Sequence, residues 1–310
     1  MIFNFLLIII CILLCSLLFS YYFKLEDNNF VNINYKVNVL LSGGCFFSLF
    51  FVFFFDNFTL DKLFVVMSFL LLGIADDRLK LKVLIRFILS SIFLLVFLLW
   101  NTDNLLSLSF LPDIYLLNIL ISLVMILGFM HTTNMSDGKN GLLTTYYLIT
   151  FSFIFFIIND IYISNFEYFF VYSLLLFLII NLLNISYLGN SGVLTLSIIS
   201  YIIFIKYYNS NLITSVDIFC LFSFLILDGL RVTLIRIINK SPIFKGDHNH
   251  IHNLFKSWIT GYLIYFMFFI FNLIALYFFR SFSYLLCFSS SIFFYYLLLS
   301  SANFISSKNV

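Results

Sequence analysis

Charged residues are scarce in this sequence. Only 10% of its 310 residues are Asp, Glu, Lys or Arg, whereas a soluble domain carries about a quarter. A chain this poor in charge, and 63% hydrophobic, cannot cover itself with a water-facing surface. A soluble globular protein is therefore excluded, and lipid must be the solvent for most of the surface.

Basic stripes, cysteine pairs and an N-terminal basic segment are also missing. No run of Lys or Arg is long enough for a nucleic-acid surface, and the net charge is only +2. The five cysteines lie in apolar segments without zinc-type pairing, so we interpret them as small buried side chains. No basic residue precedes Lys24, which disfavours a cleaved signal peptide and predicts a first membrane helix with its N-terminus outside.

What the sequence does contain is a succession of apolar runs separated by short polar segments. Most runs are long enough, or nearly so, to cross a hydrocarbon core of about 30 Å. We predict an all-α integral membrane protein with about 10–11 transmembrane helices, forming one domain over residues 1–310. The predicted spans are Ile2–Phe23, Val39–Phe55, Lys62–Ala75, Val83–Trp100, Asp113–Met130, Leu142–Ile158, Glu167–Leu183, Val193–Tyr207, Val216–Ile237, Tyr262–Phe279 and Phe282–Ser300.

The basic residues are distributed unevenly between the two sets of loops. The loops after the first, third, fifth, seventh and ninth predicted spans, with their margins, contain twelve Lys and Arg, and the opposite loops contain three. Because basic loops stay in the cytoplasm, the first set is predicted to be cytoplasmic. The chemically rich polar segments are on this same side, so we expect an active site built from cytoplasmic loops.

Two acidic motifs fall on the predicted cytoplasmic side. Asp76 and Asp77 are adjacent where the third span ends. Paired carboxylates repel each other and favour a divalent cation, and Mg²⁺ prefers such hard oxygen ligands; a solvated helix end is the alternative. The segment Asn134–Gly141 contains Asp137 among good turn formers. Alone it indicates an Asx turn, but its position beside the first acidic motif favours a shared site.

Two further segments on that side contain glycine or histidine. Gly189 and Gly192 flank two polar residues, so backbone amides there can approach a phosphate, with a tight turn as the alternative. Ser241–His252 holds three of the four histidines, which can bind zinc or donate to a diphosphate. Asp228, upstream in an apolar span, should face the protein interior because an acid in lipid is costly.

Taken in order, these motifs resemble those of the polyprenyl-phosphate N-acetylhexosamine-1-phosphate transferases, a branch of glycosyltransferase family 4. The His-Ile-His form is most similar to the enzymes that initiate O-antigen and teichoic-acid synthesis. The resemblance implies transfer of a sugar 1-phosphate from a UDP-N-acetylhexosamine to undecaprenyl or another polyprenyl phosphate, with release of UMP, at the bacterial inner membrane. It extends over Asp27–Gly44, Gly73–Arg86, Asn134–Gly141, Asn181–Gly192 and Asp228–Leu254.

The resemblance also implies roles for individual residues. Asp76, Asp77 and Asp137 would be catalytic, and together with Asn190 they would hold Mg²⁺ or Mn²⁺. The implied partners are the UDP-sugar, the lipid phosphate and the bilayer, with no nucleic acid, and a homodimer remains open. The implied substrate-binding residues are Asn134, Gly189, Arg236, Asp247, His250 and His252.

The sequence departs from the family pattern at two acidic positions. Asn190 and Asn140 stand where the family has aspartates, and a neutral amide removes charge beside a divalent ion. One alternative is therefore a catalytically impaired relative that binds lipid phosphate or nucleotide sugar. A transporter is the less favoured alternative, because transporter sites lie near the midplane and the polar residues here gather at one face.

Overall fold

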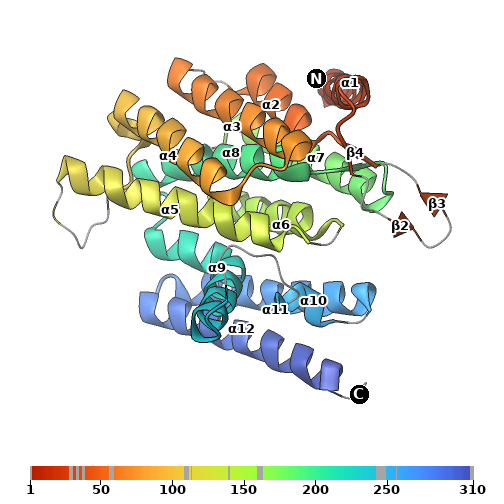
Figure 1. Cartoon of the computed structure of the whole chain (residues 1–310). Coiled ribbons are helices and arrows are strands. Elements are labelled where there is room, and N and C mark those ends of the chain that lie inside the picture. The colour runs from red at the N-terminus through yellow and green to blue at the C-terminus, as the bar shows by residue number, and fades with distance from the viewer. Residues whose placement is uncertain are drawn as a thin grey trace.

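The structure, a computed structural model, describes residues 2–27, 31–32, 35–36, 39–55, 59–107, 112, 114–138, 140–158, 163–241, 249–255 and 257–307. Within these residues the chain forms a helical bundle, and the prediction of an all-α membrane protein is confirmed (Figure 1). Seven of the described helices are long and apolar enough to cross a membrane, and three shorter helices are also apolar.

The main helices of the described residues follow the order of the predicted spans, and two helices of three and four residues interrupt them. These short helices are the 3-10 helix η1 (Thr102–Asn104) and α10 (Ile251–Leu254). The main helices are α1 (Ile2–Tyr22), α2 (Gly43–Phe54), α3 (Leu60–Leu79), α4 (Val83–Trp100), α5 (Tyr115–Ser136), α6 (Leu142–Ile157), α7 (Asn165–Leu182), α8 (Gly189–Asn209), α9 (Ser215–Ile238), α11 (Trp258–Phe279) and α12 (Tyr284–Ser307).

Several helix boundaries differ from the predicted spans where polar residues continue a helix. The third and eighth spans were predicted too short, because α3 runs on through its acidic pair and α8 begins at Gly189. Helix α5 continues to Ser136 and therefore carries His131 and Asn134. The second span was predicted too long, because residues 39–41 form a strand and α2 starts only at Gly43.

Small strands, which the hydropathy pattern did not predict, join distant segments at one end of the bundle. Strand β4 (Val39–Leu41) pairs antiparallel with β1 (Glu26–Asp27) and parallel with β5 (Ser186–Tyr187). The strands β2 (Val31–Asn32) and β3 (Tyr35–Lys36) form a separate antiparallel pair. The Oγ atoms of Ser42 and Ser186 are 2.6 Å apart, so the start of α2 is held beside the start of α8.

Glycines allow α2 and α3 to approach α8 closely. A Cβ at Gly73 would lie 2.2 Å from the Cα of Ser191, and a Cβ at Gly44 would lie 2.6 Å from the Cβ of the same serine. Any larger residue would push the helices apart, as at other small-residue contacts in membrane proteins. The acidic end of α3 is thereby placed at the first turn of α8.

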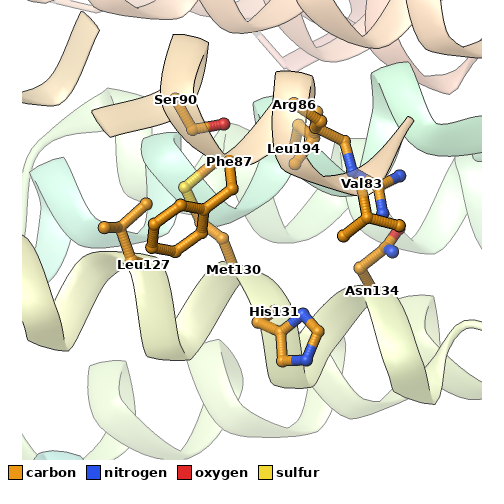
Figure 2. A pocket seen from close by; sticks show the side chains of 9 residues that line it. All are labelled: Val83, Arg86, Phe87, Ser90, Leu127, Met130, His131, Asn134 and Leu194. Atoms are coloured by element: carbon orange, nitrogen blue, oxygen red, sulfur yellow. The ribbon is translucent and has the colours of Figure 1, made fainter. Parts of the chain in front are cut away.

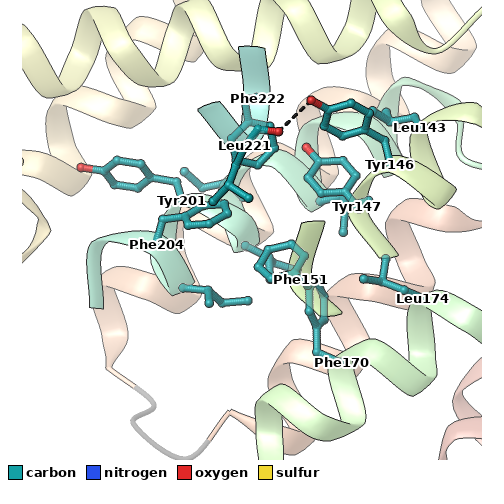
Figure 3. Close-up of a cluster of buried hydrophobic side chains, with 14 of the residues drawn as sticks. Leu143, Tyr146, Tyr147, Phe151, Phe170, Leu174, Tyr201, Phe204, Leu221 and Phe222 are labelled. Atoms are coloured by element: carbon teal, nitrogen blue, oxygen red, sulfur yellow. Dashed lines mark hydrogen bonds between the residues drawn. The ribbon is translucent and has the colours of Figure 1, made fainter. Parts of the chain in front are cut away.

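Aromatic side chains pack α9 onto this part of the bundle. Tyr146 and Phe151 from α6, Phe204 from α8 and Phe222 from α9 meet in one buried cluster (Figure 3). The Tyr146 hydroxyl donates to the carbonyl oxygen of Leu221 at 2.7 Å, which satisfies the one polar group that this ring brings into the core. Helix α9, which leads into the histidine segment, is thus anchored to α6 and α8.

Candidate active site

The acidic pair at the end of α3 separates in space. Adjacent residues on an α-helix point about 100° apart, and the two carboxylates meet different partners. Asp76 is buried and accepts a charge-assisted hydrogen bond from Nη1 of Arg86 on α4 at 2.5 Å. Asp77 accepts from the backbone N–H groups of Asn190 at 2.8 Å and Ser191 at 3.1 Å. The two carboxylates therefore have separate hydrogen-bond partners, and their predicted roles in catalysis and metal binding remain predictions.

The Asp77 carboxylate lies at the N-terminus of α8, where the helix dipole favours an anion. Gly189 makes this possible, since its φ is +66° and a Cβ there would lie 2.9 Å from Oδ2 of Asp77. The amides of residues 190 and 191, which the sequence suggested for a phosphate, thus bind Asp77. The substrate-binding role of Gly189 remains a prediction.

Asp137 follows α5 and is partly buried. Burial and the nearby Asp77 carboxylate raise the pKa of Asp137 to about 7. A carboxyl group with a raised pKa beside a second carboxylate is a place where a cation would be strongly favoured. Asp137 therefore interacts electrostatically with Asp77, a second predicted catalytic acid.

The carboxylates of Asp77 and Asp137 suit a hard divalent ion. Among the residues that the structure describes, no three His, Cys, Asp or Glu side chains come together as a metal site. Mg²⁺ commonly uses only one or two carboxylates and completes its octahedron with water and substrate phosphates. Asp77 and Asp137 are two carboxylates of the kind that such a site needs, and Asn190 follows directly after the glycine that contacts Asp77. Asp76, by contrast, is engaged with Arg86.

The histidine segment reaches the acidic loops. His250 and His252 are both buried, and their rings are nearly parallel with centroids 5.7 Å apart. A Cβ at Gly138 would lie 2.2 Å from Nε2 of His252, so the residue after Asp137 touches this ring. Asp247, predicted to bind substrate, lies outside the described residues.

A pocket between α4 and α5 opens beside these loops (Figure 2). Arg86, His131 and Asn134 contribute polar atoms, and Phe87 and Leu127 are among the apolar side chains that line the rest. Figure 2 shows Arg86 and Asn134 toward one end of the pocket and Leu127 at the other. The pocket therefore has polar atoms on one side and apolar side chains on the other, as an amphipathic ligand requires.

His131 was missed in the sequence analysis, although it lies one turn before Asn134 on the same helix face. It lies within electrostatic range of Arg86, Arg236 and His250. Arg236, at the end of α9, is buried. A group of basic side chains thus lies near the loop that carries Asp137, and two predicted substrate-binding residues, Arg236 and His250, belong to it.

Residues 59–208 match the model for glycosyl transferase family 4. The match covers just under half of the chain, and over this segment the chain is similar to a family that transfers sugar phosphates to polyprenyl phosphates. Asp77, Asp137, Asn134 and Gly189 lie inside the matched segment, whereas Arg236, His250 and His252 follow it. No curated protein matches the chain significantly.

We call the combined group the polar end; it comprises Asp76, Asp77, Arg86, His131, Asn134, Asp137, Gly189, Asn190, Arg236, His250 and His252. The acids can hold a divalent cation, and the basic side chains can neutralise phosphates. The histidine segment, although outside the residues of the family match, completes this arrangement through its contact with Gly138.

Proposed function

We propose that this protein transfers N-acetylhexosamine-1-phosphate from a UDP-sugar to undecaprenyl phosphate, or a related polyprenyl phosphate, and releases UMP. This would be the first step of a surface polysaccharide. The observation that supports it most is that Asp77 and Asp137 interact electrostatically at the same end of the bundle where basic residues line a pocket with apolar walls. Phosphoryl transfer between two anions depends mainly on charge neutralisation and positioning.

Asp77 and Asp137, with Asn190 beside them, would hold Mg²⁺ or Mn²⁺. When bound, the ion supplies charge neutralisation on the diphosphate of the UDP-sugar. Asp76 contributes by holding the Arg86 guanidinium at the pocket. Breaking this partly buried ion pair would leave an uncompensated carboxylate, so both partners are needed.

The pocket between α4 and α5 is the proposed site of the lipid phosphate. Its phosphate would meet Arg86 and His131, and its first isoprene units would lie along Phe87 and Leu127. An oxygen of the lipid phosphate bonds to the sugar-bearing phosphorus of the UDP-sugar. The bond from that phosphorus to the bridging oxygen breaks, and its electron pair leaves with UMP.

His250, His252 and Arg236 would neutralise the departing UMP, because they are the buried basic groups that follow the acidic loops. We place the polar end on the cytoplasmic side of the bacterial inner membrane, as the excess of Lys and Arg in the loops on this side supports. The substrates would then be a cytoplasmic sugar nucleotide and a lipid of the inner leaflet.

The proposal can be tested in membranes containing this protein, supplied with undecaprenyl phosphate, Mg²⁺ and either UDP-GlcNAc or UDP-GalNAc. We expect UMP release that requires both lipid phosphate and metal. Asp137→Asn should lower the rate by about 100-fold, whereas Asp103→Asn should not change it. Asp103 serves as the control because it is an exposed acid near the C-terminal end of α8. Its backbone carbonyl there accepts a hydrogen bond from the side chain of Asn209.

Two results would contradict the proposal. One is UMP release that persists without lipid phosphate, and the other is full activity in Asp137→Asn. Tight binding of UDP-sugar without any turnover would instead favour the catalytically impaired alternative, for which the neutral Asn190 is the specific observation.

A further inference from the structure

Asp228 is a buried acid in the apolar helix α9, outside the segment matched by the family model. Its Oδ2 lies 2.9 Å from Nδ1 of His250. Its Oδ1 accepts from Nη2 of Arg231 at 2.8 Å and from the hydroxyl of Tyr295 on α12 at 3.2 Å. Three side chains from separate segments therefore converge on one carboxylate.

The same group also holds the backbone of the histidine segment. Arg231 donates from Nη2 to the carbonyl of Asn249 at 2.5 Å and from Nε to the Tyr295 hydroxyl at 3.0 Å. The N–H of Ile251 points at the Asp228 carboxylate, 3.3 Å from Oδ1. The backbone on both sides of His250, and its ring, are thus fixed to α9 and α12.

The chemistry of the carboxylate determines which ring nitrogen carries a proton. An ionised carboxylate can only accept, so Nδ1 of His250 must be the donor in this contact. With Nδ1 donating to Asp228, Nε2 is the ring nitrogen that can meet a ligand.

We propose that Asp228 is a positioning residue that orients His250 and keeps its proton on Nδ1, and that Tyr295 and Arg231 hold Asp228 in place. The identity of the ligand at Nε2, the departing UMP, rests on the proposed function. Groups that orient a functional histidine through its second nitrogen typically change affinity or activity by about 10- to 100-fold.

A double-mutant cycle tests this inference on full-length protein in detergent. We expect Asp228→Asn to weaken UMP binding about tenfold and His250→Gln to weaken it at least as much. If Asp228 acts through His250, the double variant should be no worse than His250→Gln alone. Tyr295→Phe removes only the hydroxyl and should have a smaller effect of the same kind.

A spectroscopic measurement tests the same inference without relying on activity or on UMP binding. In ¹⁵N-histidine spectra, assigned by the loss of one signal in His250→Gln, His250 should show a protonated Nδ1. This state should be lost or mixed in Asp228→Asn.

Independent, additive effects of the two substitutions, or an unchanged tautomer in Asp228→Asn, would overturn the positioning role and leave the proposed function intact. If the unmodified protein neither binds UMP nor releases it while the Nδ1 proton still depends on Asp228, the proposed function fails and the positioning role stands.

Discussion

Gly138 lies directly against the ring of His252. A Cβ at residue 138 would come within 2.2 Å of Nε2, far inside any normal contact distance. The loop after α5 and the segment after α9 therefore meet at a point where a side chain has no room. Glycine at this position lets the acid Asp137 and the two histidines occupy one end of the bundle.

Gly138→Ala should consequently impair the site without unfolding the bundle. The methyl group must displace either the His252 ring or the loop that carries Asp137, and misplacement of about 1 Å can lower a rate by about 100-fold. The measurement is UMP release, with thermal unfolding as a check on folding. Gly128→Ala is the matched control on α5, because no atom lies within 4 Å of its added Cβ. Equal activity in both variants would show that the contact has no functional importance.

Asn190→Asp should raise metal-dependent turnover. The new carboxylate would stand at the first turn of α8, beside Asp77, and would add a charge that attracts the ion. Without metal the same change should lower thermal stability, because two carboxylates then repel each other. Rates and melting curves with and without Mg²⁺ measure both effects. A rate that is unchanged or lower in the presence of metal would argue against a role for residue 190 at the ion.

Metal affinity should depend on pH. The pKa of Asp137 is about 7 in the ion-free protein, above its ordinary value, so the group is mainly protonated below that pH. A carboxyl group must lose its proton to bind a cation, and affinity for Mn²⁺ should therefore rise as the pH passes through about 7 and then level off. Paramagnetic resonance of free Mn²⁺ measures this directly. Asp137→Asn should bind Mn²⁺ weakly, with little pH dependence. An equally flat profile in the unmodified protein would contradict the assignment of Asp137 as a ligand of the ion.

The orientation in the membrane gives a separate prediction. Lys80 follows α3 at the polar end, and Asn209 ends α8 at the opposite end; both are exposed. In a background without the native cysteines, Lys80→Cys should react with a membrane-impermeant maleimide only after the cells are permeabilised. Asn209→Cys should react in intact cells. The reverse pattern would place the polar end outside.

The helices were predictable from the sequence because each apolar run is bounded by polar residues. Their ends were not, since hydropathy falls where Asp76 and Asp77 begin although the α-helix continues to Leu79. The strands β1, β4 and β5 are two or three residues long. Segments this short have no alternation that a sequence pattern can reveal.

Much of the candidate site was predictable from loop sidedness alone, which placed the acids and histidines at one membrane face. The pairing of individual side chains was not. The two acids have different partners because successive helical residues point apart, and Arg86 and Ser191 come from other helices. Tyr295 reaches Asp228 across 67 positions in the sequence, and a contact of that range leaves no local signal.

The central claim is that a sugar leaves the nucleotide together with its phosphate. The most direct measurement uses two UDP-GlcNAc samples, one labelled with ³²P in the β-phosphate and the other in the α-phosphate, with undecaprenyl phosphate and Mg²⁺. The account predicts that the β-label enters the lipid fraction and the α-label remains in UMP. Retention of the β-label in water-soluble UDP, while the sugar moves to the lipid, would contradict it.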